Sequence, residues 1–327
     1  MKSLPQYWYG RNGVSSALLP ISWLFSLLVF LRRWAYRLRL FRVVRLPVPV
    51  IIVGNISVGG TGKTPLVIWL VNQLKAEGYK PGIISRGYGG GARTWPQAVR
   101  PDGDPRSVGD EAILIARRTH CPMAVGPDRV AAAEALLKNS EIDVLISDDG
   151  MQHYALARDM EIVVIDGDRR FGNQRCLPAG PLREPMGRLD KVDLKVCNGV
   201  AGRGEFAMRL VPGPITHVKE STRTLSWESL AGQKLHLVAG IGNPERFFRS
   251  VQKRHPSCEC HAFDDHYPFS PADLDFGDNN PVLMTEKDAM KAALFPQPHF
   301  WCLPVEASLD DVFKQRILKQ LRETKHG

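Results

Sequence analysis

A glycine-rich loop that ends in a lysine and a threonine carries the most specific chemistry in this sequence. The loop joins an apolar, β-branched run at residues 50–53 to a helical pattern that begins at Lys63 and Thr64. Glycines allow backbone N–H groups to face an anion, and the N-terminus of the following helix adds partial positive charge. In the pattern G-x-x-x-x-G-K-[ST], the lysine reaches the β- and γ-phosphates and the hydroxyl binds Mg²⁺. The sequence therefore predicts a nucleotide-binding loop formed by Ser57, Val58, Gly59, Gly60, Thr61, Gly62, Lys63 and Thr64, with Ser57 in place of the first glycine.

Two adjacent carboxylates, Asp148 and Asp149, follow a second apolar run at residues 144–147. An acid at the tip of a strand beside a phosphate-binding loop holds Mg²⁺ or its water, and ligands of open α/β sheets gather at the carboxyl ends of the strands. A strand ending in Asp-Asp-Gly is also a common turn, but the glycine-rich loop favours the metal role. The sequence does not decide between the two carboxylates. Gln152 and His153 follow at once and are expected to face the same crevice.

Two further positions offer acid–base chemistry. Asp110 follows a glycine and precedes a helical run, so it is either a helix cap or a base that accepts a proton from a substrate hydroxyl. His266 lies in a cluster with Asp264 and Asp265, either of which could orient it as a proton acceptor.

Charge is distributed unevenly along the 327 residues. The net charge is +9, yet no Asp or Glu precedes Glu77. Eight basic residues lie in the first 45 positions: Lys2, Arg11, Arg32, Arg33, Arg37, Arg39, Arg42 and Arg45. A nucleic-acid-binding groove would spread its charge over a folded surface, so this distribution argues against a nucleic-acid partner.

The same N-terminal region contains eighteen consecutive uncharged residues, 14–31. As a helix this run measures about 27 Å, just short of a comfortable bilayer span. A cleaved signal peptide is excluded because the charge follows the apolar run and no small-residue cleavage site succeeds it. A buried core helix is the alternative. We favour an interfacial anchor, which places the nucleotide-binding domain on the cytoplasmic side of a membrane.

The remaining chain alternates strand and helix patterns, which predicts an α/β fold with a mostly parallel sheet. We expect strands at 48–53, 82–85, 144–147 and 162–165, and helices at 64–77 and 128–138. A second, smaller α/β unit begins with a strand at 235–239. The predicted division is an anchoring segment at 1–46, a nucleotide-binding domain at 47–225 and a domain that closes the cleft at 226–327. The six cysteines show no paired framework, and Cys258-Glu259-Cys260-His261 is interpreted as structural rather than as a zinc site.

Seven motifs in order resemble the lipid A 4'-kinase (tetraacyldisaccharide 4'-kinase, LpxK) family. They are VGNISVGGTGKTP at 53–65, SRGYGG at 85–90, VGDE at 108–111, DDGMQH at 148–153, LPAGPLRE at 177–184, DHYPF at 265–269 and TEKDAMK at 285–291. The resemblance covers nearly the whole chain, and Ser57 is also this family's usual departure from the general loop pattern.

The resemblance implies an enzyme of lipopolysaccharide biosynthesis on the cytoplasmic face of the inner membrane. Its reaction transfers the γ-phosphate of ATP to the 4'-hydroxyl of an acylated glucosamine disaccharide-1-phosphate, a membrane lipid, with Mg²⁺. It implies that Gln152 and Glu184 join Asp148 or Asp149 around the metal, and that Asp110 is the base, assisted by His266. Arg86 and Arg129, with His153, are implied contacts to the substrate. The alternative from another class is a membrane-associated P-loop ATPase switch acting on a protein partner, which would need no dedicated base.

Overall fold

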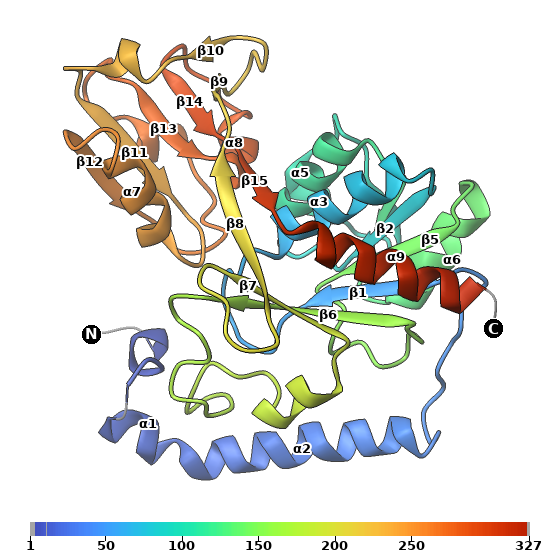
Figure 1. Ribbon diagram of the computed structural model, residues 1–327. Helices are drawn as coiled ribbons and strands as arrows, with labels where there is room; N and C mark the ends of the chain where they lie inside the picture. The colour runs from blue at the N-terminus through green and yellow to red at the C-terminus, as the bar shows by residue number, and fades with distance from the viewer. Residues whose placement is uncertain (1–3, 11, 326–327) are drawn as a thin grey trace.

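The computed structural model describes residues 4–10 and 12–325. Lys2 and Arg11, two of the basic residues counted above, lie outside the described residues. Within the described part the chain forms two β-sheets, each flanked by helices, and a long N-terminal helix that lies along the outside of the first (Figure 1).

The first sheet has nine described strands in the order β15-β8-β7-β6-β1-β5-β2-β4-β3. Its centre is parallel, because β1 pairs in parallel with both β5 and β6. The strands are β1 (Val50–Gly54), β2 (Pro81–Ser85), β3 (Gln97–Ala98), β4 (Met123–Val125), β5 (Val144–Asp148), β6 (Met160–Asp166), β7 (Leu194–Asn198), β8 (Phe206–Pro212) and β15 (Val305–Ser308).

Helices cover both faces of this sheet, which explains why β1, β5 and β6 read as continuous apolar runs and are buried throughout. On one face lie α3 (Lys63–Ala76), α4 (Pro105–Val108), α5 (Asp110–Thr119) and α9 (Asp311–Lys325). On the other face lie α6 (Arg129–Asn139), the segment 171–185 and the helix η2 (Met186–Lys191) that follows it. The predicted α/β fold with a mostly parallel sheet is confirmed.

The second sheet has six described strands in the order β10-β9-β14-β13-β11-β12 and is parallel from β14 to β12. The strands are β9 (Ile215–His217), β10 (Thr224–Leu225), β11 (Leu235–Ala239), β12 (Cys258–Ala262), β13 (Val282–Thr285) and β14 (Phe300–Leu303). Its helices are η3 (Glu228–Leu230), α7 (Pro244–Gln252), η4 (Pro271–Leu274) and α8 (Glu286–Ala292). We call the first sheet with its helices the first lobe, and the second sheet with its helices the second lobe.

The chain crosses between the two lobes twice. It passes from the first sheet to the second between β8 and β9, and it returns to the first with β15 and α9. Phe313 of α9 is fully buried against Trp69 of α3 and Phe206 of β8. The domain division stays a prediction, but the two sheets divide the chain differently: β9 and β10, which precede position 226, are in the second sheet. Residues 305–325, which follow that position, lie on the first sheet.

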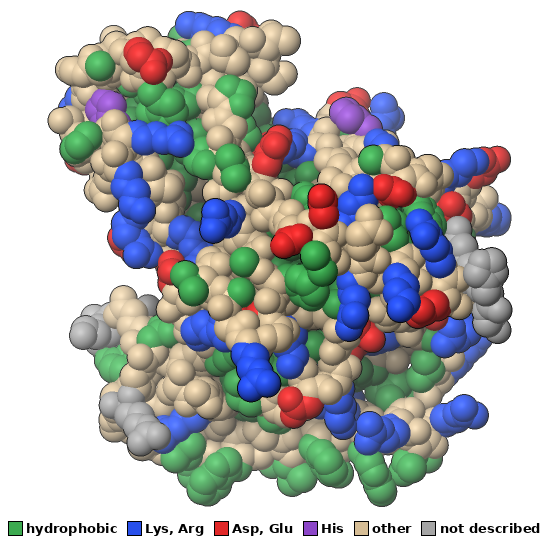
Figure 2. Space-filling view, viewed as in Figure 1, with side chains coloured by type: hydrophobic (Ala, Val, Ile, Leu, Met, Phe, Trp, Pro, Cys, Tyr) green, Lys and Arg blue, Asp and Glu red, His purple; other side chains and the backbone are tan. Residues whose placement is uncertain are grey.

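The N-terminal helices run along the first lobe: η1 (Leu4–Tyr7), α1 (Gly13–Ala17) and α2 (Leu19–Arg37) (Figure 1). They are attached by a narrow face, on which the hydroxyls of Ser15 and Ser22 donate to the carbonyls of Ala179 (2.5 Å) and Cys176 (2.7 Å). The opposite face of α2 is apolar and exposed, with Trp23 at 66% and Phe30 at 59% (Figure 2). Among the described residues, none of the helices is long and apolar enough to cross a bilayer.

Candidate functional site

The glycine-rich loop connects β1 to α3 at the carboxyl end of the sheet, as the sequence predicts. Gly62 precedes α3 with φ of +94°, and a Cβ added there would lie 2.5 Å from the Asn198 amide nitrogen. That amide donates to the carbonyl of Thr61 (3.2 Å), and the side-chain amide of Asn55 donates to Thr61 Oγ1 (3.3 Å). Among residues 4–10 and 12–325, no side chain caps the first turn of α3, so its N–H groups are open to an anion.

The motif LPAGPLRE at 177–184 lies directly against this loop. The N–H of Val58 donates to the carbonyl of Pro181 (2.8 Å), and Ser57 forms an antiparallel bridge with Leu182. Ser57 is therefore part of a backbone pairing, which fixes the start of the loop without the glycine of the general pattern.

Lys63 faces the carboxylate of Asp149. Its Nζ lies 3.6 Å from Asp149 Oδ1, and Arg183 donates to both oxygens of the same carboxylate at 3.0 and 3.2 Å. Burial opposes ionisation, but the charges of Lys63 and Arg183 prevail and lower the pKa of Asp149 to about 2. Asp149 is thus a carboxylate at neutral pH, and it holds Lys63 beside the loop.

Asp148, at the end of β5, is in a different state although it is adjacent in sequence. Its carboxyl is 1% exposed, Oδ2 accepts a long hydrogen bond from Ser85 Oγ (3.4 Å), and Oδ1 has no hydrogen-bond partner among the described residues. Burial, followed by the negative charge of Glu111, raises the pKa of Asp148 to about 7. An unpartnered buried carboxylate oxygen beside a lysine is an arrangement that a divalent cation would satisfy.

The environment of Asp148 predicts how the stability of the protein depends on pH when metal and nucleotide are absent. The pKa of Asp148 is raised from 3.8 to about 7 on folding, so the folded state binds the proton more tightly and loses stability as the pH rises through that window. We expect Asp148→Asn to remove this loss, raising the melting temperature relative to wild type at about pH 8 but not at about pH 4. Thermal unfolding in a chelating buffer measures it; a pH dependence unchanged by the substitution would contradict the assignment.

Gln152 and Glu184 are in contact, and both form several hydrogen bonds or ion pairs with other residues. Glu184 is fully buried and accepts from the Gln152 amide (2.8 Å) and the Tyr154 hydroxyl (2.6 Å), and Arg188 approaches it at 3.3 Å. Arg33 of α2 lies 3.7 Å from the same carboxylate. Gln152 also donates to the carbonyl of Asn55, where the loop begins (3.1 Å). These contacts link the N-terminal helix to the loop, and a metal role for Gln152 and Glu184 stays a prediction.

Asp110 and His266 come from different lobes and meet. Asp110 is the first residue of α5 and is 6% exposed; its Oδ1 lies 3.2 Å from His266 Nδ1 and accepts from the N–H of Glu111 (2.8 Å). Its other oxygen, Oδ2, has no hydrogen-bond partner among the described residues. Burial would raise the pKa of Asp110, but His266 and Lys287 together hold it below the usual value. Asp110 is therefore ionised at neutral pH, and its Oδ2 lies 3.9 Å from Lys291 Nζ.

Lys287 also belongs to this region, although it is not among the site residues predicted from the sequence. Its Nζ lies within 3.1 Å of Glu111 Oε1, Asp265 Oδ1 and His266 Nε2. Burial opposes the charge, but the carboxylates of Glu111, Asp110 and Asp265 raise the pKa of Lys287, so it remains a cation. Lys287 lies inside TEKDAMK, and that motif was the available signal, but no local pattern shows that its lysine crosses to the other lobe.

The three predicted substrate contacts differ in accessibility. Arg86 is exposed, whereas Arg129 is 3% exposed and donates to the carbonyls of Gly126 (2.8 Å) and Asp148 (3.5 Å). Burial lowers the pKa of Arg129 to about 10, which leaves it charged. Burial and the charge of Arg129 lower the pKa of His153 to about 4, so His153 is neutral.

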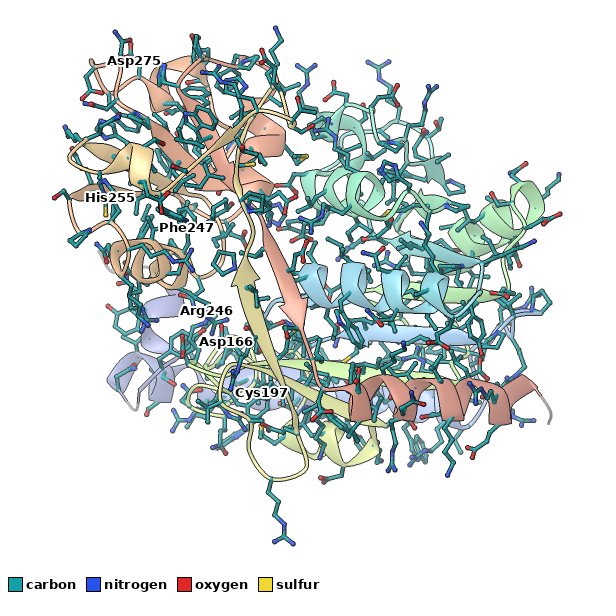
Figure 3. All side chains as sticks on the ribbon, turned by 45° about the horizontal axis from the view of Figure 1, so that its top comes forward. Asp166, Cys197, Arg246, Phe247, His255 and Asp275 are labelled. Atoms are coloured by element: carbon teal, nitrogen blue, oxygen red, sulfur yellow. The ribbon has the colours of Figure 1, made fainter. Side chains whose placement is uncertain are left out.

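The lobes also touch at the glycine-rich loop itself. Arg169 donates to the carbonyl of Gly60 in the loop and to that of Gly242 in the second lobe, both at 2.6 Å. Asp166, at the end of β6, accepts from Arg246 of α7 at 2.7 Å, and Figure 3 shows these two side chains facing each other between the lobes. The loop and the Asp110–His266 pair therefore both lie where the lobes meet.

The fold and this geometry define an α/β protein with a glycine-rich loop at a helix N-terminus and a carboxylate–histidine pair between two lobes, an arrangement typical of a phosphoryl-transfer enzyme. The chain belongs to the Tetraacyldisaccharide-1-P 4'-kinase family, whose model matches residues 14–322.

Individual relatives agree. The chain is 54% identical over 319 residues to a tetraacyldisaccharide 4'-kinase of Nitrosococcus oceani, covering 97% of this chain and 94% of the relative. It is 50% identical over 320 residues to that of Methylobacillus flagellatus, covering 97% and 95%. Among solved structures it is similar to the "apo" form of LpxK from Aquifex aeolicus in complex with ATP, with a TM-score of 0.77 and 28% identity, over 94% of this chain and 99% of that one.

Proposed function

We propose that this chain is the ATP-dependent kinase that phosphorylates the 4'-hydroxyl of an acylated glucosamine disaccharide-1-phosphate in lipid A biosynthesis. The observation that carries the proposal is the pairing of Asp110 with His266 in the region of Lys63 and Asp148, together with membership of the 4'-kinase family. An ATPase switch would need no such pair.

In this proposal the loop holds ATP. The backbone N–H groups of residues 59–62 and the first turn of α3 surround the β-phosphate, and Lys63 leaves Asp149 to contact the γ-phosphate. Asp149 stays ionised because Arg183 remains as its partner. Phosphoryl transfer needs mainly positioning and neutralisation of charge, which these fixed groups supply.

Thr64 and Asp148 would hold Mg²⁺, with Asp149 beside them. The free oxygen of Asp148 and the hydroxyl at the start of α3 are hard oxygen donors, which suit this ion. When bound, Mg²⁺ neutralises charge that develops on the transferring phosphate.

Asp110 acts as the base. Its Oδ2 accepts the proton of the attacking hydroxyl, while His266 and the N–H of Glu111 hold Oδ1 and fix the direction of the carboxylate. Lys287 in turn holds His266 through Nε2. Arg86, which is exposed, would contact the anionic group of the substrate. Arg129 supports the end of β5 through the carbonyl of Asp148, and a substrate contact of Arg129 and His153 stays a prediction.

In this proposal the exposed face of α2 holds the enzyme against the cytoplasmic face of the inner membrane, where its lipid substrate would lie. Apolar side chains on that face are followed by arginines at 32, 33, 37, 39, 42 and 45, which suits an anionic lipid surface. This segment lies on the membrane rather than across it.

Replacing Trp23, Leu27 and Phe30 together by serine is expected to release the protein from vesicles that contain anionic lipid. Each is at least half exposed, so folding is preserved, while loss of the apolar contact weakens binding by on the order of 10²-fold or more. Vesicle sedimentation measures it. The matched control replaces Val200 and Val312, which are equally exposed elsewhere, and should sediment as wild type. Equal sedimentation of both variants would remove α2 from the membrane contact.

The decisive experiment for the function uses γ-labelled ATP and a disaccharide-1-phosphate lipid A precursor in detergent micelles. Labelled lipid that depends on enzyme and Mg²⁺ is expected. ATP hydrolysis without labelled lipid would overturn the proposal and favour the switch.

A further inference from the structure

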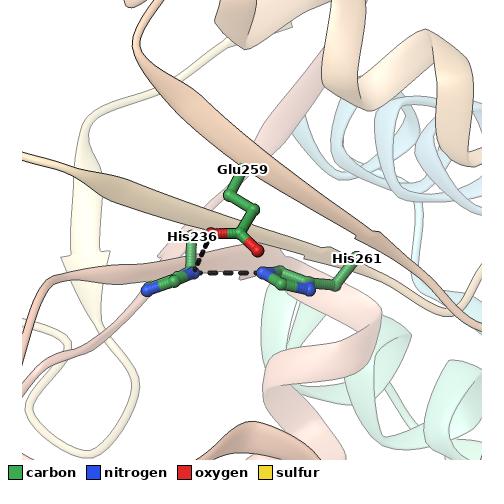
Figure 4. Close-up of side chains that lie close together, drawn as sticks. All are labelled: His236, Glu259 and His261. Atoms are coloured by element: carbon green, nitrogen blue, oxygen red, sulfur yellow. Dashed lines mark hydrogen bonds and ion pairs between the residues drawn. The ribbon is translucent and has the colours of Figure 1, made fainter. Parts of the chain in front are cut away.

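The second lobe contains a group of metal-ligating side chains that phosphoryl transfer does not use. His236, Glu259 and His261 each place one ligand atom within 4.8 Å of the others (Figure 4). His236 is on β11 and the other two are on β12, where Glu259 pairs in register with His236 and His261 lies two residues further along. All three side chains therefore project from one face of the sheet.

The distances between these atoms, one of which is that of a hydrogen bond, are also close to those between the ligands of a metal ion. His236 Nδ1 lies 3.0 Å from His261 Nε2 and 3.8 Å from Glu259 Oε2. Ligands at about 2.0–2.1 Å from a tetrahedral zinc ion stand about 3.3–3.4 Å apart, between these two values. A shift of a few tenths of an ångström converts the cluster into a coordination site.

The surroundings of His236 add an independent argument. Its other ring nitrogen, Nε2, lies 3.2 Å from both oxygens of Asp278. A carboxylate on the far nitrogen fixes the tautomer and leaves Nδ1 with the lone pair, as is usual for a metal-ligating histidine. His236 is also 1% exposed, and Phe276 stacks on the rings of both His236 and His261. Both imidazoles are thus held in place before any ion binds.

The charge of the site also favours a cation. Glu259 and Asp278 contribute two carboxylates, and Lys234 already approaches them at 3.0 and 3.7 Å. Lys234 is half exposed, so its ammonium can move into solvent when a divalent cation takes its place.

We propose that His236, Glu259 and His261 form a binding site for a divalent transition-metal ion, with zinc as the best match. Two imidazoles and one carboxylate suit zinc and its neighbours rather than Mg²⁺ or Ca²⁺, which prefer oxygen ligands. Glu259 is half exposed, so the fourth position is open to water. The bound ion would join β12, the edge strand, to β11 and, through Asp278, to the loop before β13.

The sequence analysis interpreted Cys258-Glu259-Cys260-His261 as structural, and the structure separates its residues. Side chains alternate along a strand, so Cys258 and Cys260 point to the face opposite from Glu259 and His261. The ligand that completes the set, His236, is more than twenty positions earlier, outside the spacing of any short zinc motif.

Calorimetric titration of the purified full-length chain with Zn²⁺, repeated with Co²⁺ and followed by visible absorption, tests the proposal. We expect wild type to bind one equivalent more tightly, by at least about 10-fold, than His261→Ala and Glu259→Gln, which alter an edge strand without touching the core. Asp278→Asn should weaken binding by about 10- to 100-fold while leaving all three ligands present.

The matched control is Cys258→Ser combined with Cys260→Ser, which should bind like wild type and give the same Co²⁺ spectrum. A loss of binding in this control would assign the metal to the thiols, and binding unchanged in His261→Ala would reject the site; either result overturns the proposal. The readouts are binding and spectra, so they do not depend on kinase activity. Circular dichroism of each variant verifies that it is folded.

Discussion

Lys63→Ala is expected to abolish phosphate transfer, with a loss on the order of 10²–10³-fold or more in kcat. Lys63 is the first residue of α3, and its ammonium is held beside the loop by Asp149 at 3.6 Å. In the proposed reaction it leaves this carboxylate for the γ-phosphate, so its charge acts where negative charge develops. Alanine is a good helix former, and α3 should keep its fold by circular dichroism.

Lys75→Ala is the matched control for that experiment. Lys75 is on the same helix but donates to the carbonyl of Thr119 (2.8 Å), away from the loop. Its loss should lower the melting temperature slightly and leave kcat unchanged. Substantial transfer by Lys63→Ala, or an equal loss in Lys75→Ala, would show that the loop assignment is wrong.

The local parts of this site are predictable from sequence because short-range chemistry dictates them. A β-branched run, a glycine-rich turn and a helix start specify β1, the loop and α3, and an apolar run that ends in Asp148 and Asp149 specifies β5. What local sequence does not specify is the difference between the two carboxylates. Arg183 and Lys63 make Asp149 a strong acid, whereas the burial of Asp148 and the charge of Glu111 make it a weak one.

Contacts between residues that are distant in the sequence cannot be predicted from local sequence patterns. Asp110 and His266 are 156 positions apart, and the motif resemblance alone connected them before the structure did. The return of β15 and α9 to the first sheet depends on pairing of β15 with β8 across most of the second lobe. An amphipathic pattern at 311–325 predicts a helix but not the surface that it covers.

The contacts between the lobes connect the locally specified loop with the long-range Asp110–His266 pair. Residues from the second lobe, His266 and Gly242, contact Asp110 directly and the glycine-rich loop through Arg169. In the proposed reaction, the second lobe therefore contacts both the base and the loop, and closure of one should accompany closure of the other. Such coupling would keep the base away from water until both substrates are held.

Asp110→Asn separates the two interpretations that the sequence left open for this residue. As the base, Asp110 accepts a proton through Oδ2, so the amide should lower kcat by about 10²–10⁴-fold while the affinity for ATP stays the same. As a helix cap alone, asparagine would serve about as well as aspartate, so kcat and stability should both change little. Single-turnover transfer and ATP titration distinguish these outcomes.

Asp104→Asn is the matched control, because Asp104 is an aspartate that caps a neighbouring helix, α4, through the N–H of Arg106 (2.9 Å). It should leave kcat unchanged and change the stability little, because asparagine caps a helix about as well as aspartate. The pH profile gives an independent measure: the pKa of Asp110 lies below its usual value, so wild-type transfer should be insensitive to this group at neutral pH and fall only in acid. His266→Ala removes the main hydrogen bond that lowers this pKa, so burial then prevails and the acid limb should move to higher pH. An acid limb that does not move in His266→Ala would mean that the pair, although in contact, does not act as one unit.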